Sequence, residues 1–181
     1  MAWPTLGILV VLTMVAYLDR NIVSLMVGMI KADLGVSDLK ISLLQGFAFA
    51  LFYSLCALPL GYAVDRSPRR WIILAGVLIW AAAATACGLV SNYSQLLVAR
   101  MMVGLGEAAL APAAYSMLSD LFPKHRLAFA LSLYTVGNAI GSALALAGGG
   151  QILQVAEGGV VLPLLGDLRP WQAAFVLTGL P

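Results

Sequence analysis

The strongest constraint on this chain is a series of apolar segments that are long enough to cross a membrane. A helix that crosses about 30 Å of hydrocarbon needs roughly 20 residues, and short polar or proline-bearing breaks divide the sequence into segments of that length. Of the 181 residues, 62% are hydrophobic and 10% are charged, and the mean hydropathy is +0.97. These values lie outside the range of soluble domains. The sequence therefore predicts an all-α integral membrane protein.

The breaks define five complete spans and the start of a sixth. The complete spans are placed near residues 5–30, 41–64, 71–90, 95–120 and 127–153, and the sixth begins in 171–181 and is cut off there. The connection 154–170 contains an apolar run at 160–165, whose role the sequence leaves open. We expect the chain to be a fragment of a longer protein that lacks a partner half.

The distribution of basic residues predicts the orientation of the spans. The loops 65–70 and 121–126 lie on one side and carry five lysines and arginines, and the opposite loops carry Lys31, Lys40 and Arg169. This excess favours a cytoplasmic N-terminus, and we expect a multi-pass protein of a bacterial inner membrane. The net charge of +2 is too small to suggest a nucleic-acid partner.

Four charged residues lie inside the apolar spans: Asp19 and Arg20 in the first, Arg100 and Glu107 in the fourth. Each costs about 2.5–3.5 kcal/mol at a helix centre on insertion scales, so such residues usually line a transport or proton path. Because Arg20 and Glu107 lie at similar depths, we predict that they pair, which leaves Asp19 to a different neighbour. Two acids and two bases sum to zero charge.

Polar residues also follow one face of each helix that would surround such a path. At 100° per residue, the first span carries a polar stripe, and the fourth and fifth spans each carry a face that could reach a shared cavity. Gly137-x-x-x-Gly141 on the fifth span favours close helix packing. The predicted charge partners and cavity residues are Tyr17, Arg20, Asn21, Arg100, Tyr115 and Asn138.

Two motifs on these spans resemble the N-terminal six-helix half of the major facilitator superfamily. The segment from Gly61 to Arg70 is similar to the family's Gly-x-x-x-Asp-Arg-x-Gly-Arg-Arg loop, with Pro68 in place of a glycine, and the run Arg100-Met-Met-Val-Gly-Leu-Gly-Glu107 resembles its proton-linked motif on span four. The resemblance covers essentially the whole chain and implies one half of a 12-helix fold. The family's inverted triplets would make the first and fourth spans structural equivalents.

Within this superfamily the chain most resembles the Spinster branch. The resemblance is carried by Tyr17-Leu-Asp19-Arg20, by Glu107 and Pro112, and by the run from Asp120 to Arg126. It implies a proton-coupled carrier of lysophospholipids or sphingolipids. The branch of organic-anion and sugar-acid symporters shares much of this pattern and is the alternative. Gly141-Ser142 replaces the Gly-Pro pair of the family's exporters, which leaves the transport direction open.

The expected mechanism couples protonation to conformation. Burial disfavours a charged carboxylate and a nearby arginine favours it, so we expect Asp19 and Glu107 to bind and release protons. Arg20 would act as counter-ion and contact for an anionic headgroup, and Arg100 as a partner nearer the surface. The alternative is a purely structural network of buried ion pairs.

The loop motif has a second expected role as a cytoplasmic gate. Asp65, Arg66, Arg69 and Arg70, which follow Gly61, would form a latch in one state of alternating access by reaching Asp120 or Arg126. The alternative is simple anchoring by positive charge on the cytoplasmic side.

Other functional classes receive less support from the sequence. An embedded enzyme would need a nucleophile and base or a metal cluster at a common depth, and no span shows that spacing. Cys56 and Cys87 are interpreted as packing residues, and His125 is assigned no role. We expect no metal or cofactor, a proton gradient as the driving force, and the bilayer, a small-molecule or lipid substrate and a C-terminal half as partners. A channel or non-transporting subunit remains a further alternative.

Overall fold

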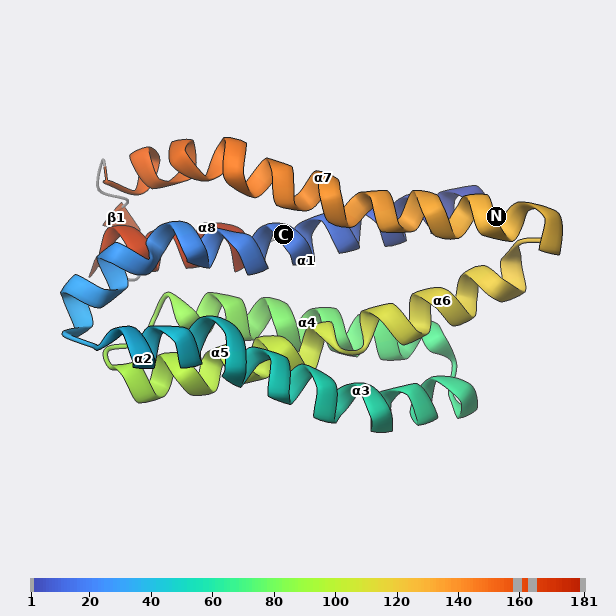
Figure 1. Cartoon of the computed structure of the whole chain (residues 1–181), viewed down its shortest axis with the longest axis horizontal. Coiled ribbons are helices and arrows are strands. Elements are labelled where there is room, and N and C mark those ends of the chain that lie inside the picture. Colours follow the sequence, from blue (N-terminus) through green and yellow to red (C-terminus); the bar gives the residue numbers. More distant parts are fainter. Residues whose placement is uncertain (1, 158–160, 163–165, 180–181) are drawn as a thin grey trace.

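The computed structural model describes residues 2–157, 161–162 and 166–179. Its helices lie side by side along the long axis of the molecule (Figure 1). In chain order the elements are α1 (Ala2–Leu34), α2 (Asp38–Ser42), the π-helical turn η1 (Leu43–Phe47), α3 (Ala48–Arg66), α4 (Arg69–Cys87), α5 (Tyr93–Glu107), α6 (Leu110–Leu121), α7 (Lys124–Glu157), the strands β1 (Val161–Leu162) and β2 (Gly166–Asp167), and α8 (Pro170–Gly179). The two strands form a short antiparallel pair.

The described residues contain five helical segments that are long and apolar enough to cross a membrane. They are α1, the continuous segment from α2 through η1 to α3, α4, the segment of α5 and α6, and α7 as far as Gln151. Many of their exposed side chains are large and apolar, for example Leu58, Leu78 and Val98. The all-α membrane fold predicted from the sequence is confirmed, and α8 supplies the start of the sixth helix.

The fourth span differs from the single helix predicted at 95–120. It is interrupted at Ala108 and Ala109, between α5 and α6, where the amide of Ala109 bonds the carbonyl of Gly106 three residues back at 3.4 Å. Pro112 explains the interruption, because it has no N–H to donate to the carbonyl of Ala108. The sequence contained this signal, but the prediction did not use it.

Smaller differences occur at the other elements. The second span begins at Asp38, earlier than predicted, and contains the π-helical turn. Of the apolar run 160–165, residues 161–162 form β1 and the remainder lies outside the described residues. Local signals set several helix ends: Gly35 takes a positive φ of 59° directly after α1, and the Asn92 side chain accepts a hydrogen bond from the Gln95 amide at 2.9 Å, capping α5.

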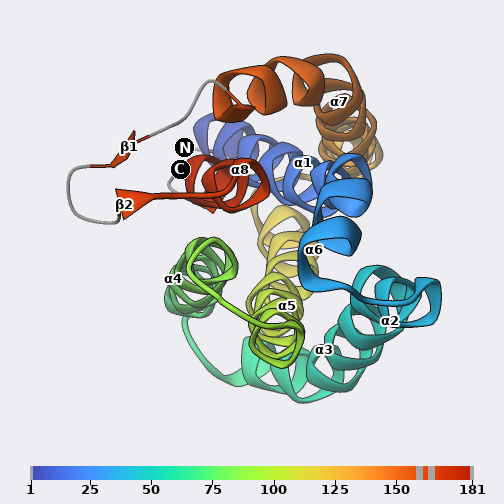
Figure 2. The same ribbon diagram turned by 90° about the vertical axis from the view of Figure 1, so that its left-hand side faces the viewer.

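The broken fourth span lies in the middle of the bundle. Viewed along the long axis, α5 and α6 are surrounded by α1, α3 and α4 (Figure 2), and this span is the most buried of the five. The helix α1 packs mainly along α7, and α4 packs along α5 and α8. Side chains on α5 and α6 are therefore placed to contact those on α1.

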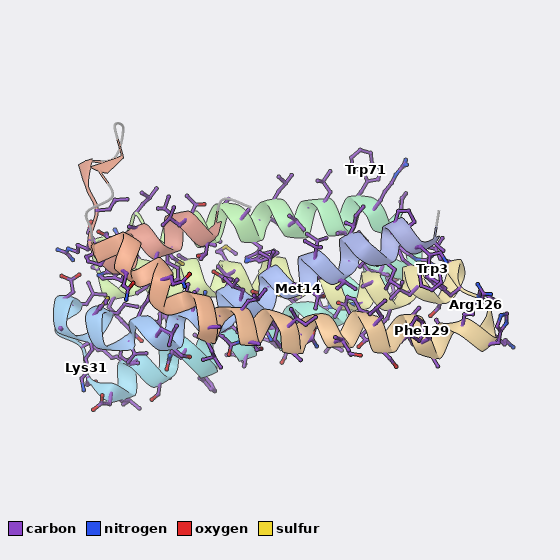
Figure 3. All side chains as sticks on the ribbon, turned by 90° about the horizontal axis from the view of Figure 1, so that it is seen from above. Trp3, Met14, Lys31, Trp71, Arg126 and Phe129 are labelled. Carbon is purple, nitrogen blue, oxygen red and sulfur yellow. The ribbon has the colours of Figure 1, made fainter. Side chains whose placement is uncertain are left out.

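The two ends of the bundle differ in their number of basic residues, with five in the turns at one end and three at the other. At one end, here called the basic end, lie the α3–α4 and α6–α7 turns, and Arg126 and Phe129 are at this end in Figure 3. The opposite end carries Lys31 (Figure 3). The aromatic side chain of Trp3 contacts Phe122 at the basic end, with ring centroids 5.1 Å apart.

Close helix packing beside the interruption depends on Gly106, and we expect Gly106→Ala to destabilise the protein. A Cβ at this position would lie 2.6 Å from the backbone nitrogen of Trp80 and 2.7 Å from the carbonyl oxygen of Gly76, so α4 and the fourth span would have to separate. Overpacking of this kind typically costs about 1–3 kcal/mol.

Thermal unfolding of the full-length protein in detergent measures this cost. The matched control is Gly148→Ala, since a Cβ there meets nothing within 4 Å. Equal melting temperatures for the two variants would contradict the prediction.

Candidate functional site

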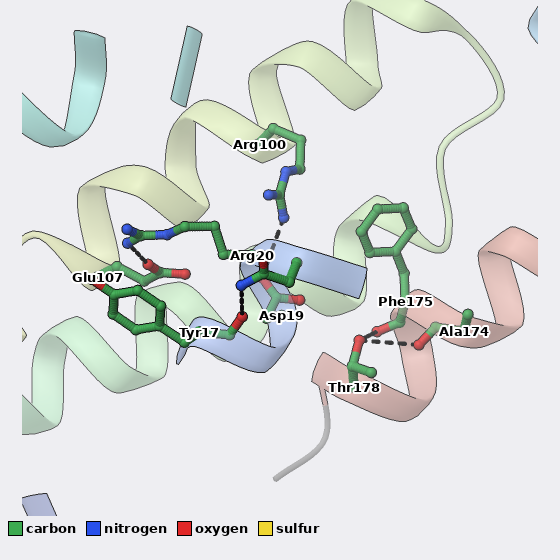
Figure 4. Close-up of polar contacts among 9 residues, drawn as sticks. Tyr17, Asp19, Arg20, Arg100, Glu107, Ala174, Phe175 and Thr178 are labelled. Carbon is green, nitrogen blue, oxygen red and sulfur yellow. Dashed lines mark hydrogen bonds and ion pairs between the residues drawn. The ribbon is translucent and has the colours of Figure 1, made fainter. Parts of the chain in front are cut away.

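The first element of the site is an ion pair between α1 and α5. The Arg20 guanidinium donates to the Glu107 carboxylate, as predicted from their equal depth (Figure 4). Glu107 is the last residue of α5 and lies 14 residues from each end of the span Tyr93–Leu121. The Arg20 side chain is 30% exposed, whereas that of Glu107 is 1% exposed.

A second ion pair joins the same two helices. The Arg100 guanidinium donates to the Asp19 carboxylate at 3.2 Å, and the two side chains are 1% and 0% exposed. Seven residues separate Arg100 from Glu107, which corresponds to two helical turns and about 10.5 Å. The two pairs therefore lie one after the other along the contact between α1 and α5 (Figure 4).

The two pairs are not fully satisfied by hydrogen bonds. One buried polar atom of each residue has no partner, namely Asp19 Oδ1, Arg20 Nε, Arg100 Nε and Glu107 Oε1. Buried polar groups in proteins nearly always have partners, and leaving one unsatisfied carries a free-energy cost. The arrangement therefore leaves hydrogen-bonding capacity for another group at both pairs.

Aromatic rings hold the Arg20 side chain in place. Its Cζ lies 4.5 Å from the ring centroid of Phe49, 4.9 Å from that of Tyr17 and 5.4 Å from that of Tyr53. Such contacts are attractive because the ring face carries negative charge. The guanidinium is therefore stabilised by contacts in addition to its carboxylate partner.

A pocket of about 230 Å³ opens beside the Arg20–Glu107 pair. On its wall Tyr115 of α6 meets Tyr134 of α7 edge to face, with ring centroids 5.5 Å apart. The pocket combines charged, hydroxyl and apolar groups from α1, α3, α5, α6 and α7. Its lining residues are Thr13, Ala16, Tyr17, Arg20, Tyr53, Glu107, Leu110, Ala111, Tyr115, Tyr134 and Asn138.

Five of the predicted site residues line this pocket: Tyr17, Arg20, Glu107, Tyr115 and Asn138. Asp19, Asn21 and Arg100 do not line it. Arg100 is a charge partner, of Asp19, whereas Asn21 was expected at the cavity and lies outside this pocket. Asn21 instead donates to the Tyr17 carbonyl at 2.7 Å and to the Ser142 hydroxyl at 3.1 Å, tying α1 to α7.

Arg100 lies seven residues from the start of the span Tyr93–Leu121, which is nearer an end of the span than Glu107. Its side chain is nevertheless among the largest that are fully buried within the bundle. The prediction missed Tyr53 of α3. Tyr53 lies in an apolar span, three residues before Cys56, and no polar stripe on that span marked it as a site residue.

The predicted gate residues meet only in part. Arg69, at the start of α4, forms an ion pair with Asp120 near the end of α6. Arg66 lies over the ring of Tyr62, and no ion pair to Arg126 or Asp65 is present among the described residues. Gly61, which opens the motif, has open space where a Cβ would lie.

The described residues contain no group of three or more histidine, cysteine, aspartate or glutamate side chains that could hold a metal ion. The site itself presents two carboxylates, two guanidiniums and several phenols. These groups can bind an anion or a zwitterion and can exchange protons.

The architecture and the site agree with a family comparison. The profile of the Major Facilitator Superfamily matches residues 9–181. This chain belongs to the Major Facilitator Superfamily. Its members are transporters and not enzymes, in line with the expectation from the sequence.

A solved structure of a major facilitator protein shows how closely the fold is matched. A bacterial homologue of the human lysosomal transporter Spinster, in an inward-facing and occupied conformation, is 31% identical, with a TM-score of 0.89 over 97% of this chain and 41% of that chain. The resemblance to the Spinster branch and the fold of the N-terminal half are thus both supported by sequence and by structure.

Curated relatives extend over most of this chain but belong to different transport classes. An efflux pump of Mycolicibacterium smegmatis is 28% identical over 98% of this chain and 38% of its own length. A D-galactonate transporter of Escherichia coli is 25% identical over 97% and 37%, and a sphingosine-1-phosphate transporter of Xenopus tropicalis is 33% identical over 83% and 29%. The chain therefore spans well under half the length of each of these relatives.

Proposed function

We propose that the full-length protein is a proton-coupled secondary transporter that works by alternating access and carries lysophospholipids or sphingolipid-like amphiphiles. The observation that carries this proposal is the Arg20–Glu107 ion pair, which lies at the wall of a pocket halfway along the fourth span. Buried charges at this depth are expensive in a membrane and usually serve function.

Glu107 is the proposed proton-coupling group. Its carboxylate is held by Arg20, and its second oxygen has no partner. An anionic substrate group that binds Arg20 would compete with Glu107 for the guanidinium, and protonation of Glu107 would release Arg20 for the substrate. Substrate and proton would then favour the same state of the protein, which is the requirement for coupling.

Asp19 is the second proposed proton-coupling group. Asp19 does not line the pocket, and both Asp19 and its counter-ion Arg100 are almost fully excluded from solvent. Its unpartnered Oδ1 is the feature that favours a role beyond structure.

The pocket lining favours an amphiphile with an anionic or zwitterionic head. Arg20 and the tyrosines supply donors, and Leu110 and Ala111 supply apolar wall. The resemblance to the Spinster branch and the relative that carries sphingosine-1-phosphate support a lipid. The relative that carries D-galactonate supports the second candidate, a symporter of organic anions or sugar acids, whose carboxylate Arg20 would also bind.

The gate and the cellular location are further parts of the proposal. The Arg69–Asp120 ion pair links the loop motif to the fourth span, as a cytoplasmic latch would. The surplus of arginine and lysine at the basic end favours a cytoplasmic N-terminus, and we place the protein in a bacterial inner membrane.

A flux assay with the full-length protein in proteoliposomes tests the substrate and the coupling together. We expect a fluorescent lysophospholipid to move across the membrane under a pH gradient, with loss of the effect when a protonophore is added, whereas D-galactonate moves no faster than in protein-free vesicles. Galactonate flux without lysolipid flux would favour the sugar-acid symporter. Flux that does not depend on the pH gradient would favour a channel. No flux of either compound would favour a non-transporting subunit.

A further inference from the structure

The two ends of the bundle differ in how their basic side chains are neutralised. At the opposite end, Lys31 pairs with Asp38 and Arg169 pairs with Asp33, and Lys40 lies over the ring of Tyr93, 5.4 Å from its centroid, with no carboxylate partner among the described residues. At the basic end, Arg69 pairs with Asp120. In the part of the chain that the structure describes, no carboxylate oxygen lies within 4.0 Å of the remaining basic residues at this end, which are Arg66, Arg70, Lys124 and Arg126.

Two of these unmatched arginines lie on aromatic rings at the α3–α4 turn. The Cζ of Arg66 is 3.8 Å from the ring centroid of Tyr62, and that of Arg70 is 5.4 Å from the ring of Trp71. Tyr62 is 64% exposed and Trp71 is 58% exposed, and Trp71 points away from the bundle (Figure 3). Contact through the face of a guanidinium leaves its N–H groups free to donate at the edge.

The position of these side chains matches the depth of lipid headgroups. Tyrosine and tryptophan are enriched where a spanning helix meets the membrane–water interface, and Tyr62 and Trp71 flank the turn at the ends of two spans. Arg66 and Arg70 are four residues apart, so their Cα atoms are separated by at most about 14 Å. Both can therefore reach one headgroup region.

A hollow beside Arg70 adds an apolar surface. It has a volume of about 270 Å³ and is bounded by the α4 start and the end of α6. Its apolar wall comes from Pro68, Met117 and Leu121, and its polar wall from the Arg69–Asp120 pair and Arg70. The N–H groups of the arginine and the apolar wall of the hollow together suit a ligand that is charged at one end and apolar at the other.

We propose that Arg66 and Arg70, held on Tyr62 and Trp71, bind the phosphate of an anionic phospholipid of the surrounding bilayer. The planar guanidiniums donate to the phosphate oxygens, and the glycerol and first acyl carbons lie against Met117 and Leu121. The unmatched positive charge favours an anionic lipid over a zwitterionic one. This site is separate from the pocket beside Glu107.

Lipid titration of the full-length protein in nanodiscs tests the proposal. The probe is phosphatidylglycerol in a phosphatidylcholine background, with bound lipid counted by native mass spectrometry. Removing two basic groups near a membrane surface is expected to lower the affinity of Arg66→Gln/Arg70→Gln for phosphatidylglycerol by roughly 30-fold. The control Lys31→Gln/Lys40→Gln removes the same charge at the opposite end and is expected to bind like the wild type.

Further arms distinguish the site from general electrostatics. The variant Arg66→Lys/Arg70→Lys keeps the charge but loses the planar fork, and we expect an intermediate affinity. Equal loss in both glutamine pairs, or wild-type binding by Arg66→Gln/Arg70→Gln, would overturn the proposal. So would displacement of the lipid by millimolar inorganic phosphate, which would indicate a site for free phosphate. Thermal unfolding of each variant confirms that the compared proteins are folded.

Discussion

Glu107→Gln is expected to abolish the pH-driven component of substrate flux, down to the level of protein-free vesicles, while the protein remains folded. Glutamine has nearly the shape of glutamate, so it fills the same space beside the interruption. Its amide group, however, does not bind or release a proton in the physiological pH range. Arg20 keeps its contacts with three rings and its access to the pocket. Arg20 therefore tolerates the loss of its Glu107 counter-ion better than an arginine that is fully excluded from solvent would.

Counterflow separates coupling from binding in this variant. With substrate on both sides and no pH gradient, Glu107→Gln should still exchange labelled for unlabelled substrate, because Arg20 remains in the pocket. The matched variant Glu107→Asp keeps a carboxyl group and should retain part of the pH response. A Glu107→Gln protein whose uptake still follows the pH gradient at the wild-type rate would exclude Glu107 as the coupling group.

Asp19→Asn is expected to lower the stability of the protein by about 3–5 kcal/mol, because it leaves the Arg100 charge buried without a counter-ion. The pair is almost fully excluded from solvent, with exposures of 0% and 1%, so water cannot replace the lost carboxylate. The double variant Asp19→Asn/Arg100→Met, which removes both charges, should recover most of this loss. Thermal unfolding and the yield of folded protein measure both effects.

The same variants test the proposed role of Asp19 in coupling. Loss of pH-driven flux in the folded double variant Asp19→Asn/Arg100→Met would support a role of Asp19 in proton coupling. Wild-type pH-driven flux in that variant would limit the Asp19–Arg100 pair to stability.

The sequence was sufficient for the fold class and for one of the two ion pairs. Hydropathy and length define the spans, and the equal depth of Arg20 and Glu107 was enough to predict their pairing. The burial of Arg100 could not be read in the same way, because it depends on side chains from other helices meeting around it. Its Cζ lies 5.7 Å from the ring centroid of Phe49 on α3 and 6.0 Å from that of Phe175 on α8.

Contacts that depend on helix register were also beyond the sequence. Asn21 lies on the predicted polar stripe of α1, yet its side chain bonds Ser142 of α7 and does not line the pocket. Tyr53 joins the pocket because α3 packs along the central span, which no local pattern specifies. By contrast, the interruption near Glu107 was marked in the sequence by Pro112.

That interruption has a mechanical consequence. Each half of the fourth span, α5 and α6, is a continuous and stiff rod, so bending is concentrated at Ala108 and Ala109. If the span bends at this point, α6 tilts relative to α5. The tilt moves the pocket wall that carries Tyr115, whereas Glu107 stays with α5. The width of the pocket can therefore change without separating the ion pairs that join α5 to α1.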